Sequence, residues 1–214
     1  MWHMFTGIVE EIGIIKGITP VKNMVQLEIL AKNVMTDMSL GDSLATNGVC
    51  LTICKIIDTS VFATVMPVTI ERTTLSTLKI GSEVNLERAV TPNSRLGGHF
   101  MTGHIDGVEE VLSITGNELE KNYKFSLNPE YANMVAKKGS IAVSGVSLTV
   151  TDVGDNWFSV SLIPYTIEST ILKNLKISDE VNIEVDVIAR YLARLLNSDN
   201  SPKLTLERMV ELGF

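Results

Sequence analysis

The chain has 214 residues, of which 45% are hydrophobic and 20% charged, and its formal net charge is −7. This composition is typical of a globular protein, and the acidic balance argues against a nucleic-acid partner, because such proteins usually present a basic face. The N-terminus does not resemble a signal peptide, no apolar run reaches the roughly 18 residues that would cross a bilayer, and two cysteines are too few for a disulfide framework, so we expect a cytoplasmic protein that does not enter a membrane.

Short alternating segments predict β-strands in much of the chain. Apolar and polar side chains alternate at residues 25–29, 158–162 and 181–185. A period of two buries one face of a strand, and turn-forming pairs separate the segments at 41–42, 81–82, 106–107 and 154–155. Short helices are expected at 129–135 and where Pro67 and Pro164 can occupy a first helical turn.

The sequence contains an internal repeat. Residues 47–52 (NGVCLT) return as residues 144–149 (SGVSLT), an offset of 97. The pairs PVTIE/PYTIE and VNLE/VNIE keep that offset, whereas TGIV at 6–9 and TGHI at 102–105 are 96 apart. This is a tandem duplication, and we predict one domain at 1–98 and a second at 99–195, joined through turn-forming residues at 91–98. Each repeat is predicted to form a small β-barrel, because closure of the sheet removes its exposed edges.

The tail at 187–214 differs from the repeats. Ile188, Tyr191, Leu192 and Leu195 follow a helical spacing that predicts an amphipathic helix. Two interpretations remain open, one in which the helix packs against another subunit and one in which it caps its own domain. A last short helix is expected at 206–212, ending at Gly213.

Cys50 of the first repeat corresponds to Ser147 of the second. The thiol is either a small hydrophobe within the structure or a nucleophile, and the second role requires a lowered pKa. Cys54 is expected to lie in the core, and without a histidine cluster beside it we predict no zinc site.

His99 and His104 lie in a glycine-rich segment and are either turn residues or groups that exchange protons near neutral pH. Lys138, expected at the start of the strand leading to Ser147, is either a surface residue or a site residue. Recurring hydroxyls near the repeated glycines suit the polar edge of a heterocycle; they belong to Ser43, Thr52, Thr69, Thr149 and Thr166. We find no phosphate loop, dinucleotide fingerprint or nucleophile elbow.

Five segments in this order resemble one family: residues 4–11 (MFTGIVEE), 47–52 (NGVCLT), 97–107 (GGHFMTGHIDG), 145–149 (GVSLT) and 163–166 (IPYT). They resemble riboflavin synthase of the α-chain type, which has two lumazine-binding repeats, and the resemblance covers residues 4–214. It implies two six-stranded Greek-key barrels followed by a C-terminal helix that holds a homotrimer together. It also implies lumazine synthase as a candidate partner.

The resemblance implies a transferase that uses neither cofactor nor metal. Two molecules of 6,7-dimethyl-8-ribityllumazine dismutate, and one gives a four-carbon unit to the other, so that riboflavin and 5-amino-6-(D-ribitylamino)uracil form in the last step of riboflavin biosynthesis. A reaction between two copies of one substrate suits two related pockets, which in the family meet between the first barrel of one subunit and the second barrel of its neighbour.

By position, the resemblance assigns binding residues to each pocket. The first would use Gly7, Ile8, Val9, Cys50, Leu51, Thr52, Thr64, Val65, Met66, Pro67, Val68 and Thr69. The second would use Gly103, His104, Ile105, Lys138, Ser147, Leu148, Thr149, Leu162, Ile163, Pro164, Tyr165, Thr166 and Ile167.

Catalytic roles are hypotheses built on the chemistry of the substrate. His104 would assist removal of a proton from the acidic 7-methyl group, and Cys50 or water would add to C7 of the partner lumazine. The hydroxyls that would stabilise developing charge belong to Ser43, Ser147 and Thr149. Lys138 and Phe5 complete the predicted catalytic set, the latter at a family position needed for activity.

The chain departs from the family pattern at two places. Ser144 stands where the second repeat of the family often has an aspartate, and residues 1–3 precede the usual start at Met4. The main competing interpretation is a lumazine- or flavin-binding antenna protein of the same family that has lost catalysis. An oligonucleotide-binding barrel is disfavoured by the net charge and the few aromatic residues.

Overall fold

The computed structural model describes residues 4–117 and 119–197. The first repeat forms a closed antiparallel barrel with the cyclic strand order β1-β2-β5-β4-β3-β6. Its strands are β1 (Glu11–Val21), β2 (Met24–Leu30), β3 (Ser43–Thr46), β4 (Val49–Ile57), β5 (Ser60–Val65) and β6 (Glu83–Arg88). Between β5 and β6 lie helix α1 (Pro67–Glu71) and the 3-10 turn η1 (Thr74–Thr77).

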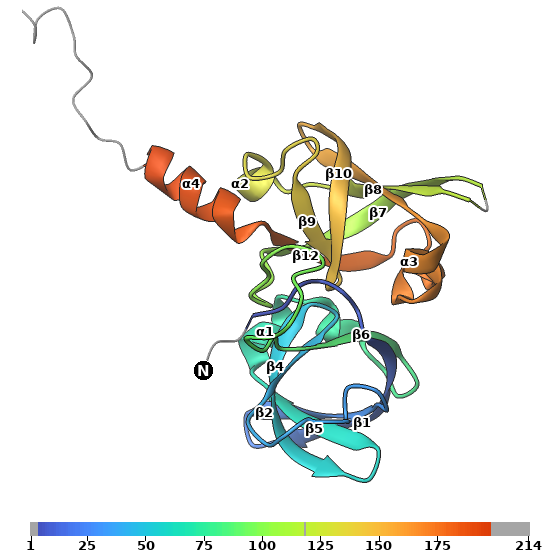
Figure 1. The fold of residues 1–214 in the computed structure, drawn as a ribbon, viewed down its shortest axis with the longest axis vertical. Helices are drawn as coiled ribbons and strands as arrows, with labels where there is room; N and C mark the ends of the chain where they lie inside the picture. Colours follow the sequence, from blue (N-terminus) through green and yellow to red (C-terminus); the bar gives the residue numbers. More distant parts are fainter. Residues whose placement is uncertain (1–3, 118, 198–214) are drawn as a thin grey trace, which may run out of the picture.

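The second repeat closes in the corresponding order, β7-β8-β11-β10-β9-β12. Its strands are β7 (Gly107–Gly116), β8 (Lys121–Ser126), β9 (Ser140–Val143), β10 (Val146–Gly154), β11 (Trp157–Leu162) and β12 (Glu180–Val185). Its short helices are α2 (Pro129–Ala132), α3 (Pro164–Glu168) and η2 (Ile171–Asn174), and α4 (Val187–Asn197) follows β12. The prediction of two six-stranded barrels and a C-terminal helix is confirmed (Figure 1), while the exact domain boundaries stay a prediction.

Strand β4 shows how the alternating pattern orients side chains. Val49, Leu51 and Ile53 are buried in the barrel core. The residues that alternate with them, Cys50, Thr52 and Cys54, face outward, and Cys54 is exposed. The prediction that Cys54 is a core residue is therefore wrong, because a period of two puts it on the same outer face as Cys50.

Each barrel encloses its own core. The first is filled by buried aliphatic side chains from all six strands. The second also contains Tyr123, Phe125 and Phe158, whose rings stack with centroids 6.2 Å and 5.2 Å apart. Because each repeat buries a core of its own, the barrels are separate packing units that lie next to each other (Figure 1).

The contact between the barrels has an approximate two-fold symmetry. The side-chain amide of Asn85 donates to Ser144 O at 2.8 Å, and that of Asn182 donates to Asn47 O at 2.9 Å. Gly48 and Gly145 face each other so closely that a Cβ on either would lie within 2.8 Å of the other's backbone nitrogen. The repeated glycine therefore serves the junction between the barrels, and Ser144, the departure from the family pattern, lies in this junction.

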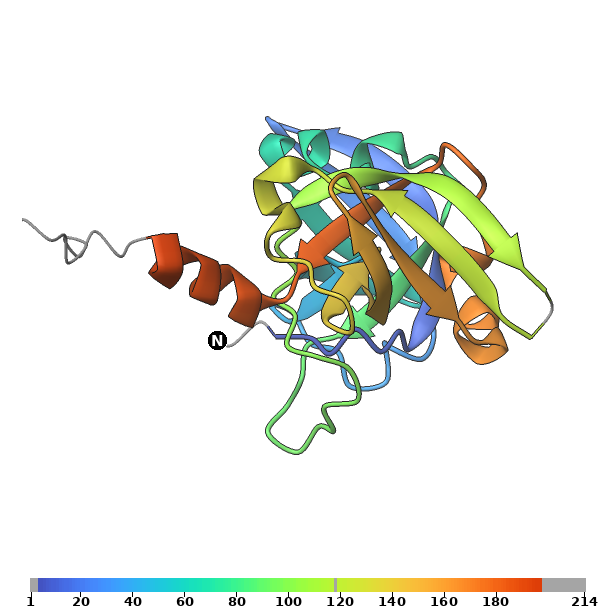
Figure 2. The same ribbon diagram turned by 90° about the horizontal axis from the view of Figure 1, so that it is seen from above.

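Helix α4 projects away from the barrels (Figures 1 and 2). Its first turn is tied down by Arg190, whose guanidinium contacts both carboxylate oxygens of Asp106 at 2.7 and 2.9 Å. The apolar residues of its predicted stripe are more than half exposed, at Ile188, Tyr191, Leu192 and Leu195. Leu196 beside them is exposed as well. The described part of the chain thus leaves this stripe uncovered. The helix predicted at 206–212 lies outside the described residues, and no helix among those described is long and apolar enough to span a membrane.

Candidate active sites on the two barrels

The segments that precede β1 and β7 cross between the barrels. Phe5 and Met101 are completely buried and form an antiparallel bridge, with backbone N–H···O distances of 2.8 and 3.1 Å. Beyond this bridge, Gly7 O accepts the N–H of Ser147 at 2.8 Å, and Gly103 O accepts the N–H of Cys50 at 2.9 Å. Each segment therefore lies against the strand that carries the cysteine or serine of the other repeat.

This crossing corrects the predicted composition of the two pockets. The sequence grouped Gly7–Val9 with Cys50, but Val9 packs against the core of the second barrel. Ile105 packs against the core of the first. The grouping was wrong because the Phe5–Met101 bridge sends each segment across the symmetry axis.

The first candidate site, here called the Cys50 site, lies on the outer face of β4 and β5. Cys50 and Thr64 are partly exposed, and Thr52 and Met66 are exposed. Exposed His104 and half-buried Ile105 belong to the crossing segment that runs past Cys50, and the start of α1 supplies Pro67, Val68 and Thr69. The side chains of Leu51 and Val65 point into the core, so only their backbone can face a ligand.

The second candidate site, the Ser147 site, repeats this arrangement on β10 and β11. Ser147 is half-buried and Thr149 exposed, and Ile8 on the crossing segment is also exposed. The residues at the start of α3 are Ile163, Pro164, Tyr165, Thr166 and Ile167, of which the first three are exposed. Leu148 and Leu162 are buried in the core and offer only their backbone.

His99 distinguishes the Ser147 site from the Cys50 site. Its Nδ1 lies 2.7 Å from Ser147 Oγ, and its ring is buried with Nε2 lacking a hydrogen-bond partner. Burial lowers the pKa of His99, although the charge of Asp186 opposes this shift. The imidazole is therefore neutral near pH 7 and fixes the serine hydroxyl. Sequence reasoning noted His99 but did not select it, since its contact with Ser147 arises only in the folded chain.

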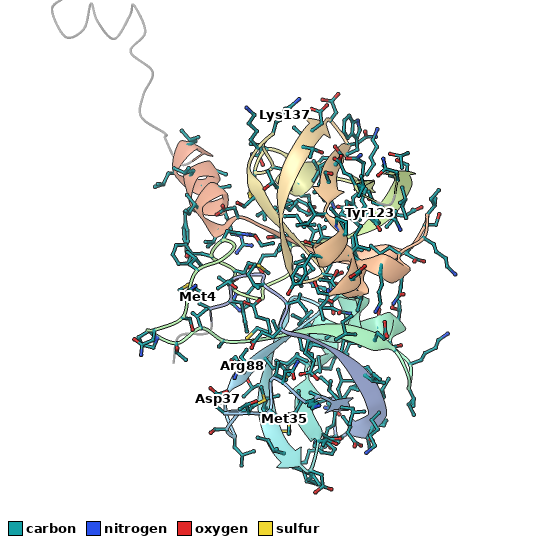
Figure 3. All side chains as sticks on the ribbon, turned by 45° about the vertical axis from the view of Figure 1, so that its right-hand side comes forward. Met4, Met35, Asp37, Arg88, Tyr123 and Lys137 are labelled. Atoms are coloured by element: carbon teal, nitrogen blue, oxygen red, sulfur yellow. The ribbon has the colours of Figure 1, made fainter. Side chains whose placement is uncertain are left out.

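Ser43 and Lys138 occupy different environments. Ser43 is buried on β3, and its hydroxyl is hydrogen-bonded to the Cys50 thiol. Ser43 also lines a cavity of about 490 Å³ that shares only Ile8 with the other predicted site residues. At one side of this cavity the Arg88 guanidinium pairs with Asp37 (Figure 3). Lys138 is exposed in the turn before β9, with φ of 67°.

The electrostatics of Cys50 disfavour a thiolate. Burial raises the pKa of the Cys50 thiol, the hydrogen bond from Ser43 opposes this shift, and the negative charge of Glu184 adds to it. A thiol nucleophile needs a lowered pKa. The Cys50 side chain is therefore a neutral thiol at pH 7, suited to contact a ligand rather than to attack it.

Two buried glutamates that contact the crossing segments were missed by the sequence analysis. Glu87 and Glu184 are 5% and 1% exposed, and each is the last residue but one of its strand, β6 and β12 respectively. Burial raises the pKa of Glu87 to about 7 against the opposing hydrogen bonds from Thr6 and Gly7, and burial likewise raises that of Glu184. The signal was present in the repeated VNLE and VNIE, where a charge recurs at the end of a buried strand. Among the described residues no group of three or more histidine, cysteine, aspartate or glutamate side chains could hold a metal ion.

The family model described as the lumazine binding domain matches residues 6–89 and 102–186. The riboflavin synthase of Bacillus amyloliquefaciens is 44% identical over 200 residues, which cover 94% of this chain and 93% of the relative. The chain belongs to the riboflavin synthase family. A second member, from Actinobacillus pleuropneumoniae, is 41% identical over 99% of this chain and the whole of the relative.

Solved structures that are similar to this chain include LumP in complex with a lumazine and with riboflavin. The crystal structure of LumP complexed with 6,7-dimethyl-8-(1'-D-ribityl) lumazine matches with a TM-score of 0.76 at 26% identity, covering 85% of this chain and 98% of that one. LumP complexed with riboflavin matches with a TM-score of 0.77 at 27% identity. The resemblance drawn from the sequence motifs is thus confirmed at the level of the family, whereas the roles of individual site residues stay predictions.

Proposed function

We propose that this chain catalyses the riboflavin synthase reaction, the dismutation of two 6,7-dimethyl-8-ribityllumazine molecules into riboflavin and 5-amino-6-(D-ribitylamino)uracil. The observation that carries the proposal is the pair of matching but unequal sites, each a crossing segment laid against the outer face of the opposite barrel. A reaction that consumes two copies of one substrate needs two related sites that treat them differently. The near full-length identity to riboflavin synthases supports the same conclusion.

The residues of each site suit the flat, polar edge of a pteridine. At the Cys50 site, Thr52 and Thr64 offer hydroxyls, and the neutral thiol of Cys50 offers a soft contact beside them. At the Ser147 site, Thr149 and Ser147 play this part, and His99 orients the Ser147 hydroxyl. In both sites the backbone of the crossing segment would bound the ring.

In the proposed mechanism, His104 assists the transfer of a proton from the 7-methyl group of one lumazine, whose carbanion delocalises into the ring. Water, rather than Cys50, adds to C7 of the other lumazine, because the pKa of Cys50 is raised. Ser147 and Thr149 stabilise the developing charge, and Ser43 acts through its bond to Cys50. Phe5 acts as a positioning residue through its buried bridge. Lys138 stays a member of the predicted catalytic set, without an assigned step. Holding the two lumazine rings in a fixed relative orientation contributes most to the rate enhancement, since orientation can lower the barrier by roughly 7–11 kcal/mol in favourable intramolecular cases.

We also propose that the active chain is a homotrimer in which the Cys50 site of one subunit meets the Ser147 site of the next. The exposed apolar stripe of α4 supports this assembly, because contiguous exposed apolar surface is typical of an interface. Sedimentation of a chain truncated after Asp186 tests the role of the helix, and an unchanged trimer would remove it. Association with lumazine synthase stays a prediction, which co-sedimentation of the two proteins can test.

The alternative function is non-catalytic binding of lumazine or flavin. Its support is the similarity of the whole fold to LumP, although identity to that protein is lower than identity to the synthases. Incubation of the purified chain with 6,7-dimethyl-8-ribityllumazine alone, followed by riboflavin absorbance, separates the two. Continuous riboflavin formation supports the enzyme, tight binding without product supports the antenna, and absence of binding contradicts both.

A further inference from the structure

Glu87 and Glu184 hold the two crossing segments in the same way. Glu87 Oε1 accepts the backbone N–H and the hydroxyl of Thr6 at 2.6 and 2.7 Å, and its Oε2 accepts the N–H of Gly7 at 2.9 Å. Glu184 accepts the N–H and hydroxyl of Thr102 at 2.7 and 2.6 Å and the N–H of Gly103 at 3.0 Å. Each carboxylate thus clamps a Thr-Gly pair with three hydrogen bonds.

Each clamp fixes a glycine that also contacts the reacting site. Gly103 donates its N–H to Glu184 and accepts the N–H of Cys50 with its carbonyl, so the carboxylate, the segment and β4 form one hydrogen-bonded chain. His104 follows directly in the sequence. Glu87 and Gly7 make the equivalent chain to Ser147. The position of each site therefore depends on a carboxylate located in the other barrel.

A carboxylate at these buried positions needs an explanation. Burying a carboxylate without a partner of opposite charge in direct contact carries a large desolvation cost, and burial raises the pKa of both glutamates. A glutamine would avoid that cost and could still accept both bonds from the threonine. Only the bond to the glycine requires a second acceptor oxygen, because the glutamine amide would present a donor to the glycine N–H.

We propose that Glu184 is a positioning residue for the Cys50 site and Glu87 a positioning residue for the Ser147 site, each acting across the junction between the barrels. This proposal rests on the proposed function, since it concerns the two sites of that reaction. Each carboxylate fixes the position of its glycine. It thereby fixes the distance between the crossing segment and the strand beside it, β4 at the Cys50 site and β10 at the Ser147 site.

The test compares Glu184→Gln and Glu87→Gln, which are matched by the duplication, alone and combined with Cys50→Ser. Replacing the acceptor of the buried glycine N–H by a donor should lower kcat/KM about tenfold or more in either single variant. Far-UV circular dichroism and the thermal midpoint should remain close to wild type, because the lower desolvation cost of the amide offsets the lost hydrogen bond to the glycine. The Glu184→Gln effect should shrink in the Cys50→Ser background, while the Glu87→Gln effect should persist there in full.

Wild-type kcat/KM in both glutamine variants would overturn the proposal. It would also be overturned if Glu184→Gln and Glu87→Gln each lowered kcat/KM by the same factor with Cys50→Ser as without it. Activity lost in parallel with the thermal midpoint would assign the clamps a structural role only. If the wild type binds lumazine without forming riboflavin, the proposed function fails, but the clamps are then tested by the same cycle with lumazine dissociation constants in place of kcat/KM.

Discussion

Substitution of Gly103 tests the crossing of the two segments. Gly103 has φ of 74°, and a Cβ built there lies 2.5 Å from Cys50 Cβ and 2.8 Å from Cys50 N, where ordinary contacts lie at 3.4–4 Å. In Gly103→Ala, the crossing segment and β4 must therefore separate by about 1 Å. A misplacement of this size at a reacting site can cost about 100-fold in rate, and that is the loss of kcat/KM that we expect for riboflavin formation.

The matched control is Gly81→Ala. Gly81 has φ of 91°, and a Cβ there meets nothing within 4 Å, so this variant incurs the backbone cost alone, about 1–2 kcal/mol in stability. Its kcat/KM should stay close to wild type. Ser178, the counterpart of Gly81 in the second repeat, has φ of 72° with a side chain already present.

The assay follows riboflavin absorbance at several lumazine concentrations, together with urea unfolding of both variants. If Gly103→Ala kept wild-type kcat/KM, the contact between Gly103 and Cys50 would not frame a reacting site. If Gly81→Ala lost as much activity as Gly103→Ala, the loss would come from backbone strain and not from the crossing.

Three further predictions concern single groups. Iodoacetamide at pH 7.5 should label exposed Cys54 before Cys50, which is partly buried with a raised pKa. If peptide mass spectrometry found Cys50 labelled first, Cys50 would again be a candidate nucleophile. Burial raises the pKa of Glu87 from 4.5 to about 7, so between these pH values the folded chain keeps a proton that the unfolded chain has lost. The contribution of Glu87 to the free energy of unfolding therefore falls by about 3 kcal/mol as the pH rises from 4.5 to 7. Urea unfolding at several pH values should show a smaller fall in Glu87→Gln than in the wild type, and an equal fall would contradict the burial argument. Asn182→Ala should lower the free energy of unfolding by about 2–4 kcal/mol, since it leaves the buried Asn47 O and Thr74 N–H without their partner; a cost near zero in urea unfolding would mean that the junction contributes little.

The sequence predicted the barrels because its signals were local and repeated. The alternation at 158–162 gave β11, and the proline at position 164 gave α3. The same alternation, applied strictly, places Cys54 beside Cys50 on the outer face, so that error was avoidable.

The composition of the sites depended on contacts that no local pattern encodes. The bridge between Phe5 and Met101 joins residues of different repeats, and it decides which segment meets Cys50. A duplicated sequence is equally compatible with each segment serving its own barrel. The bond between His99 and Ser147 likewise depends on how the junction packs.

The central claim is that one riboflavin is assembled from two lumazine molecules. Substrate carrying ¹³C in both methyl groups should be mixed with an equal amount of unlabelled substrate. The isotopologues of the riboflavin formed by the purified chain are then quantified by mass spectrometry. The account predicts unlabelled, half-labelled and fully labelled riboflavin, with the half-labelled species most abundant, because the acceptor ring and the four-carbon unit come from different molecules. Riboflavin without the half-labelled species, or no riboflavin at all from a chain that binds lumazine, would contradict it.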